Sequence, residues 1–136
     1  MNYGLEIFGD KWSLLIVRDI VFFGKKTYGE FMKSEEGVAT NVLASRLACL
    51  EKQGILAKAP DPEDGRKDFY SLTEKGLDLI PILLSIVAWG AKHDTGSGAR
   101  SHKEFVARLT RNAPKVSAET KDLVRNGGCL FPGLNT

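Results

Sequence analysis

Hydrophobic positions in the first half of the chain repeat at helical spacing in three successive segments. The first segment follows Asp10, a residue type that caps helices, and stops at Gly24. The second is short and opens at Thr27, and the third runs from about Thr40 to Gln53. The pattern predicts three consecutive helices. The first has one broad apolar face, formed by Trp12, Leu15, Ile16, Ile20 and Phe23, and the second carries Tyr28, Phe31 and Met32. In the third, Leu43, Leu47 and Leu50 are expected to point inward.

The spacing of the apolar residues changes after Gly54, which can end the third helix. Residues 55–59 and 69–72 fit two short strands, with Tyr70 and Leu72 on one face of the second. Residues 60–67, between them, are rich in Pro, Gly and Asp. The segment therefore predicts a β-hairpin with a protruding polar tip.

A long apolar segment follows, and Thr73 is suited to cap a helix that reaches roughly Lys92. Pro81 should kink this helix or begin a new segment. Apolar residues occupy two of its faces, and both faces must be covered. We expect one face to join the core of the chain and the other to meet a partner copy or the tail. The face assigned to a homodimer interface comprises Leu79, Ile82, Leu83, Ile86 and Trp89.

Residues 94–136 are predicted to extend the domain that residues 1–93 form. Residues 95–98 have the composition of a flexible linker. Two candidate helices follow at about 101–112 and 117–126, with Pro114 ending the first. Phe105 and Leu109 share one side of the first candidate helix, so we expect them to extend the dimer interface.

The composition is that of an ordinary globular domain. Hydrophobic residues make up 43% of the 136 residues and charged residues 26%, which excludes a mainly disordered or collagen-like chain. The longest apolar stretch, at 79–89, is too short to cross a bilayer, and the start has no signal-peptide pattern. Two cysteines are too few for a disulfide framework. We therefore expect a cytoplasmic protein that binds no membrane.

Motifs of catalysis are missing from the sequence. It has no nucleophile elbow, no phosphate-binding loop and no pair of carboxylates suited to a cleft. His93 and His102 have no carboxylate or cysteine at a metal-binding spacing. We therefore expect neither an enzyme nor a bound metal or other cofactor.

Charge is distributed unevenly, although the net charge is only +2. Residues 1–90 carry 11 Lys and Arg against 13 Asp and Glu, and residues 91–136 carry 8 against 4. The chain thus combines a nearly neutral body with a basic tail. Because the body is not strongly basic, we expect modest nonspecific affinity for nucleic acid.

The order of helices, hairpin and long helix is that of a winged helix-turn-helix, so the predicted fold class is mainly α with a small β-hairpin and a C-terminal helical extension. With the three leucines of the third helix inward, the opposite face carries Asn41, Ser45, Ala48 and Lys52. Small polar residues permit close approach to a major groove. The same face fits a core helix with a solvated side, and the hairpin at the right distance favours double-stranded DNA as the partner.

The DNA-contacting residues are predicted from this arrangement. Asn41, Ser45 and Thr40 would read bases. Arg46 lies near the edge of the inward face, where it could clamp a phosphate or pair with a neighbouring acid. Acids at 61, 63, 64 and 68 could offset the cations of the hairpin tip. The residues predicted to hold phosphates are Lys26, Arg46, Lys52, Arg66 and Lys67.

Five ordered blocks of the sequence resemble the winged-helix bacterial regulators of the HxlR family, which are related to the MarR family. The resemblance covers roughly residues 5–92. The blocks read GDKWSLLI from Gly9, YGEF from Tyr28, GVATNVLASRL from Gly37, YSLTEKG from Tyr70 and AWG from Ala88. The resemblance implies a homodimeric transcription regulator that acts on an inverted-repeat operator.

The chain departs from the family pattern in three places. Thr27 stands where the pattern has Arg, and the polar hairpin tip is closer to that of MarR proteins. The chain begins so close to Trp12 that the first helix of the family is expected to be nearly absent. The leading segment has no cysteine, so the resemblance does not imply that this chain senses oxidants through a cysteine there.

Two alternatives stay open. The net negative charge of residues 1–90 also fits a winged-helix module that binds a protein rather than DNA. A MarR-type regulator would respond to a small aromatic effector, in an apolar pocket lined by Tyr3, Phe8, Trp12 and Trp89. The same aromatic residues also fit ordinary core and dimer packing.

Overall fold

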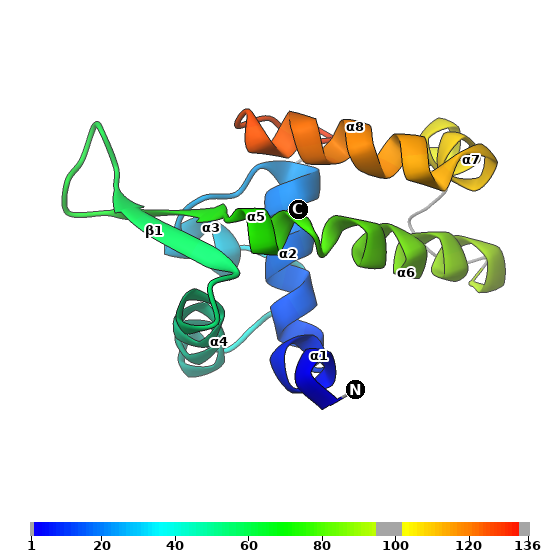
Figure 1. Ribbon diagram of the computed structural model, residues 1–136. Coiled ribbons are helices and arrows are strands. Elements are labelled where there is room, and N and C mark those ends of the chain that lie inside the picture. Colours follow the sequence, from blue (N-terminus) through cyan, green and yellow to red (C-terminus); the bar gives the residue numbers. More distant parts are fainter. Residues whose placement is uncertain (1, 95–101, 134–136) are drawn as a thin grey trace.

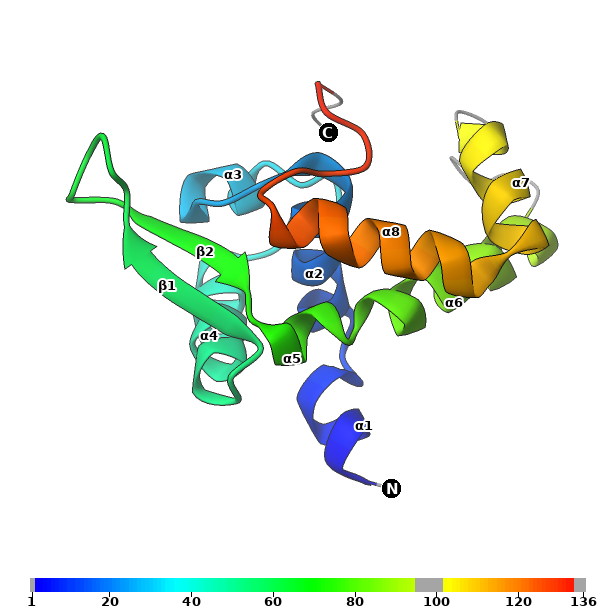
Figure 2. The same ribbon diagram turned by 45° about the horizontal axis from the view of Figure 1, so that its top comes forward.

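The computed structural model describes residues 2–94 and 102–133. Helix α2 runs through the middle of the molecule, with α4 on one side and α6 and α8 crossing on another (Figure 1). The hairpin projects away from this helical body (Figures 1 and 2). The elements are α1 Asn2–Phe8, α2 Lys11–Phe23, α3 Tyr28–Met32, α4 Thr40–Lys52, β1 Leu56–Pro60, β2 Asp68–Leu72, α5 Glu74–Leu77, α6 Ile80–His93, α7 Lys103–Arg111 and α8 Ala113–Arg125. The predicted fold class is confirmed.

Side-chain caps and left-handed glycines set the ends of the first three predicted helices. The Asp10 carboxylate accepts a hydrogen bond from the backbone N–H of Ser13 at the start of α2, over 3.0 Å. Thr27 and Glu30 form a capping box at the start of α3. Gly24 and Gly54 have φ angles of 69° and 76°, a conformation that ends α2 and α4.

The core is centred on the contact between α2 and α4. Leu43, Leu47 and Leu50 of α4 are at most 2% exposed, as the sequence predicts. Val17 and Val21 of α2 are fully buried. Burying one leucine side chain stabilises a fold by roughly 2 kcal/mol, so this contact is a main source of stability.

The hairpin is joined to the helical body at two points. Strands β1 and β2 pair antiparallel, from Leu56 opposite Leu72 to Pro60 opposite Asp68. At the middle of β2, the backbone N–H of Tyr70 donates to the carbonyl of Lys26 over 2.7 Å. At the base, the Thr73 N–H donates to the carbonyl of Ile55 over 3.0 Å. These bonds fix the direction in which the hairpin projects.

The predicted long helix is divided into α5 and α6, with Pro81 in the first turn of α6, where a proline is tolerated. This confirms the expected break near Pro81. Within the described residues, Glu74–His93 is long and apolar enough by length and composition to cross a membrane. Leu77, Ile80 and Leu84 of this segment are at most 1% exposed, so one side of it lies in the chain's own core.

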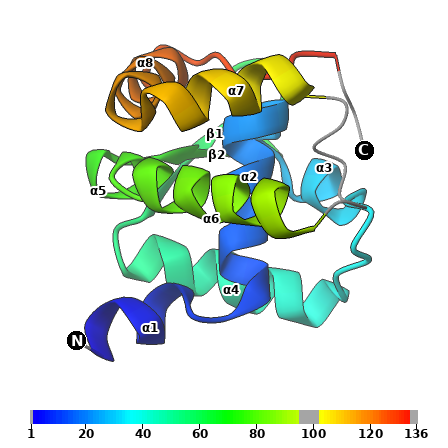
Figure 3. The ribbon, with the colours of Figure 1, turned by 90° about the vertical axis from the view of Figure 1, so that its right-hand side faces the viewer.

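The tail packs onto the body, and Figure 3 shows α7 and α8 together on one side of α6. Leu109 and Val116 are buried in the same core as α2 and α6. Pro114 lies in the first turn of α8, which therefore begins earlier than the predicted 117. The predicted linker at 95–98 lies outside the described residues.

The end of the tail also binds the end of α2. The N–H groups of Leu130 and Phe131 donate to the carbonyls of Val21 and Phe22, over 2.9 and 2.8 Å. Carbonyls in the last turn of a helix have no partner within the helix, so the tail satisfies two of them. The ring of Phe131 meets that of Phe22 edge-on, with centroids 5.4 Å apart.

The expectation of a nearly absent first helix is wrong, because α1 covers Asn2–Phe8. Ile7 is 5% exposed and anchors this helix to the core. The Lys75 ammonium donates to the Tyr3 hydroxyl over 2.6 Å and to the carbonyl of Gln53 over 2.7 Å. These contacts connect α1 with α5 and the end of α4.

Gly76→Ala should lower the free energy of unfolding by about 2–3 kcal/mol. A Cβ at this position would lie 2.3 Å from the carbonyl oxygen of Ile55, a backbone atom that cannot easily move. Urea unfolding checks this value. The control is Gly29→Ala in α3, where a Cβ would meet nothing within 4 Å, so stability should stay equal or rise slightly. Wild-type stability in Gly76→Ala would contradict the close contact.

Candidate nucleic-acid interface

The outward face of α4 is small and polar. Asn41, Ser45, Ala48 and Lys52 are all exposed, and Thr40 at the helix start is exposed as well. Within α4, which is described in full, the only acid is Glu51, whose carboxylate lies 3.9 Å from the ammonium of Lys58 on β1. The structure therefore places the predicted base-reading residues on one surface without a bulky apolar side chain.

Two side-chain contacts orient α4. The Tyr28 hydroxyl on α3 donates to the carbonyl of Thr40 over 3.0 Å. Arg46 Nη1 lies 3.4 Å from a carboxylate oxygen of Asp10, the cap of α2, and Nη2 lies 3.4 Å from the Ser45 hydroxyl. Of the two alternatives for Arg46, the structure shows the pairing with a neighbouring acid.

A largely buried ionic network, which the sequence pattern does not predict, lies under the turn between α3 and α4. Arg18 Nη1 and Nη2 donate to the two carboxylate oxygens of Glu36, over 2.7 and 3.0 Å. Arg18 Nε and Nη2 also donate to Asp19 Oδ1, over 3.1 and 2.7 Å. Asp19 Oδ2 accepts from the Lys25 ammonium over 3.3 Å and from the Ser34 hydroxyl.

The network has a visible sequence signal and an electrostatic effect. Arg18 and Asp19 interrupt an apolar run in α2, and Asp19 and Lys25 are only 2% and 4% exposed. Buried charges need partners, but the sequence pattern does not show which residues these partners are. The hydrogen bonds from Arg18 lower the pKa of Glu36 to about 2, and its positive charge adds to this effect.

The tip of the hairpin carries cations that are partly neutralised. Arg66 is 92% exposed, and its Nε lies 3.2 Å from Asp64 Oδ1. The same oxygen accepts the backbone N–H of Arg66 over 3.1 Å. These hydrogen bonds lower the pKa of Asp64. Lys67 is also exposed. Both predicted tip cations therefore face solvent, with an acid beside them.

Lys26 lies beside the hairpin rather than beside α4. Its ammonium is 5.9 Å from the centre of the Phe69 ring on β2, and its side chain is exposed. Lys52 lies in the last turn of α4. The predicted phosphate-binding cations are thus spread over the hairpin, its neighbouring loop and α4.

The structure divides the predicted dimer-interface residues into two groups. Ile82, Ile86 and Trp89 are exposed on α6, at 40%, 50% and 67%. The other four are at most 8% exposed, because they pack within the chain's own core, and they offer no surface to a partner. They are Leu79, Leu83, Phe105 and Leu109.

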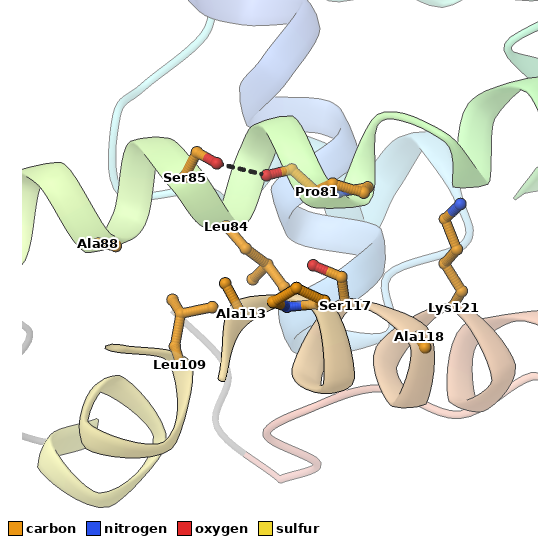
Figure 4. Close-up of a pocket in the computed structure, with 10 residues that line it drawn as sticks. Pro81, Leu84, Ser85, Ala88, Leu109, Ala113, Ser117, Ala118 and Lys121 are labelled. Carbon is orange, nitrogen blue, oxygen red and sulfur yellow. Dashed lines mark hydrogen bonds between the residues drawn. The ribbon is translucent and has the colours of Figure 1, made fainter. Parts of the chain in front are cut away.

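Two of the residues predicted to line an aromatic effector pocket, Tyr3 and Trp89, are 61% and 67% exposed, so the described residues of one chain do not enclose them. An apolar groove of about 500 Å³ lies elsewhere, between α6 and the helices of the tail (Figure 4). Leu84, Leu109 and Pro114 are among its lining residues. Small side chains line much of this groove and leave space between the facing helices. They are the alanines and serines at 85, 88, 113, 117 and 118.

Comparison with known proteins identifies relatives over the first two thirds of the chain. A family model described as HxlR-like helix-turn-helix matches residues 7–97. Two uncharacterised HTH-type transcriptional regulators, Rv3095 of Mycobacterium tuberculosis and YdeP of Bacillus subtilis, are 34% and 33% identical over 89 residues. Each alignment covers 65% of this chain, and 55% and 69% of the respective relative. The chain thus spans about half the length of the mycobacterial relative.

Solved structures show the same architecture. PA1607 is 40% identical with a TM-score of 0.59, covering 67% of this chain and 62% of its own. The reduced form of the transcriptional regulator YodB from Bacillus subtilis is 25% identical with a TM-score of 0.57, covering 71% and 95%. A SlyA-like regulator from Listeria monocytogenes, at 13% identity and a TM-score of 0.58, covers 93% and 85% and shares the fold alone.

Glu36→Gln should remove part of the loss of stability in acid. The pKa of Glu36 falls from 4.5 to about 2 on folding, so its ion pair contributes fully above about pH 4.5 and is lost as the pH falls towards 2. Allowing for solvent screening, the wild-type chain should lose about 1 kcal/mol through this group. Urea unfolding between these pH values measures it.

Glu35→Gln is the matched control for this measurement, because Glu35 is the exposed neighbour of Glu36. Its stability should follow the wild-type pH profile. If Glu36→Gln followed that profile too, the ion pair with Arg18 would have no effect on stability.

Proposed function

Because the chain belongs to the HxlR-like helix-turn-helix family, we propose that it is a transcriptional regulator that binds double-stranded DNA in a sequence-specific manner. The observation that carries this proposal is the exposed, small and polar face of α4, with the hairpin projecting beside it. Membership in a family of transcriptional regulators also agrees with the expectation that the chain is not an enzyme.

In the proposed complex, α4 enters the major groove and directs Asn41 and Ser45 towards base edges. Asparagine can pair with adenine through two hydrogen bonds, and serine can donate to or accept from either type of pair. Thr40 is the first residue of α4. Lys52 is the last, and at this end of the helix its ammonium group would contact a DNA phosphate.

Phosphate contacts would come from outside this face as well. The exposed Arg66 and Lys67 are suited to a phosphate or the minor groove beside the α4 site. Lys26 would bind a phosphate beside the middle of β2. Arg46 is 30% exposed despite its pairing with Asp10, so its remaining N–H groups can meet a phosphate at the edge. The acidic residues of the hairpin repel DNA phosphates, and they therefore limit the affinity for DNA of unrelated sequence.

We place the homodimer interface on the exposed apolar strip of α6, which consists of Ile82, Ile86 and Trp89. Exposed apolar strips of this kind are commonly covered by a second copy. A two-fold dimer would set two α4 helices about one turn of DNA apart, and the operator would then be an inverted repeat.

Asn41→Ala and Ser45→Ala should reduce the preference for specific DNA. We expect each variant to lose about 1–3 kcal/mol on a sequence that the wild-type chain selects from random pools. Binding to unrelated DNA should change much less. Anisotropy titrations of labelled duplexes measure both affinities, and Thr110→Ala on the distant α7 is the control.

Equal losses on selected and unrelated DNA would contradict base reading by these residues. A wild-type chain that binds no DNA would instead favour the alternative, a winged-helix module that binds a protein. DNA binding should also weaken steeply as salt is raised, because phosphate contacts release counterions.

Ile86→Glu should shift the chain from dimer to monomer. The substitution places a charge in the centre of the strip, and an unpaired charge buried in an interface is strongly unfavourable. Sedimentation velocity over a dilution series measures the change. The control is Leu123→Glu on α8, which is 40% exposed but lies outside the strip. A dimer of unchanged mass at low concentration would refute this interface.

A further inference from the structure

The turn between α3 and α4, residues 33–39, leads directly into the first turn of α4, and apolar packing holds only its two ends. Phe31 before the turn and Val38 at its end are buried, at 1% and 8% exposure. Between them, Ser34, Glu35, Glu36 and Gly37 contribute no buried apolar side chain. Another kind of contact must therefore hold the middle of the turn.

Two polar contacts join this part of the turn to α2 and the loop that follows it. Glu36 receives two nearly parallel hydrogen bonds from Arg18, over 2.7 and 3.0 Å, an arrangement with a defined direction. The Ser34 hydroxyl donates to Asp19 and lies 3.2 Å from the ammonium of Lys25. Arg18 and Asp19 also form hydrogen bonds with each other, so the two contacts are connected through neighbouring residues of α2.

We propose that Arg18, Asp19, Lys25, Ser34 and Glu36 are positioning residues for DNA reading, since they clamp the turn to α2 and so set the orientation of the base-reading face of α4. The inference rests on the proposed DNA-binding function. None of these side chains needs to touch DNA, because their effect passes through the turn to Thr40 and the first turns of α4.

The charges permit a test that separates positioning from simple electrostatics. DNA is a polyanion, so removing one carboxylate near it should leave affinity unchanged or raise it slightly. Positioning predicts the opposite for Glu36, because the loss of its carboxylate frees the turn. Glu35 lies one residue away and is exposed, so Glu35→Gln removes the same charge and leaves the clamp intact.

The test compares the wild-type chain, Glu36→Gln and Glu35→Gln on a duplex selected by the wild-type chain and on unrelated duplex at one salt concentration. Glu36→Gln should lose about tenfold on the selected duplex and nothing on the unrelated one. Glu35→Gln should keep the wild-type ratio. Ser34→Ala, which changes no charge, should lose about threefold on the selected duplex alone. Circular dichroism confirms that each variant is folded at the assay temperature.

A double-mutant cycle adds a second criterion. If Arg18 and Glu36 act as one unit, the double variant Arg18→Gln/Glu36→Gln should lose less than the sum of the losses of Arg18→Gln and Glu36→Gln measured singly. Fully additive losses, or a Glu36→Gln variant with the wild-type ratio of affinities, would overturn the proposal.

Amide hydrogen exchange tests the clamp without DNA. The amides of Gly37 and Leu43, which donate to the carbonyls of Ser34 and Ala39, should exchange at least tenfold faster in Glu36→Gln and at wild-type rates in Glu35→Gln. If the wild-type chain selects no DNA sequence, the proposed function fails, and exchange still decides whether the clamp exists. Unchanged exchange in Glu36→Gln would overturn the clamp whatever the chain binds.

Discussion

Burial of one face of α4 against α2 is the interaction on which the rest of the structure depends. With Leu43, Leu47 and Leu50 inward, the helical repeat directs Asn41 and Ser45 to the opposite side. Losing one such leucine would cost about 2–5 kcal/mol, a large share of the stability of a domain this size. Core packing therefore decides which face of α4 is exposed.

Helix α2 supports both halves of the chain. Its cap, Asp10, meets Arg46 of α4, and the tail binds the carbonyls of its last turn. The tail also reaches the base of the hairpin, where Arg125 of α8 makes two hydrogen bonds of 2.9 Å to Glu74. Exposed ion pairs of this kind contribute less than about 1 kcal/mol, so buried residues such as Leu109 hold most of the tail in place.

Local signals in the sequence predict the winged helix-turn-helix part well. Caps, left-handed glycines and helical spacing are encoded within a few residues, and α2, α3, α4 and the hairpin follow them. Contacts between distant residues are not encoded in this way. Arg18 and Glu36 are 18 positions apart, and nothing local pairs them.

The two-faced helix shows the same limit. The sequence places Leu83 and Ile86 in one stripe, but only the structure shows that the core covers the first and leaves the second exposed. The sequence does not locate the start of α8, because Pro114 fits the end of one helix and the first turn of the next equally well.

Selection of bound duplexes from a random DNA pool tests the central claim, that the exposed face of α4 reads sequence, most directly. The account predicts enrichment of an inverted repeat whose half-sites are centred about 10 base pairs apart. It also predicts that the pool loses this enrichment when Asn41 and Ser45 are both changed to alanine. A pool that stays random with the wild-type chain would contradict the account.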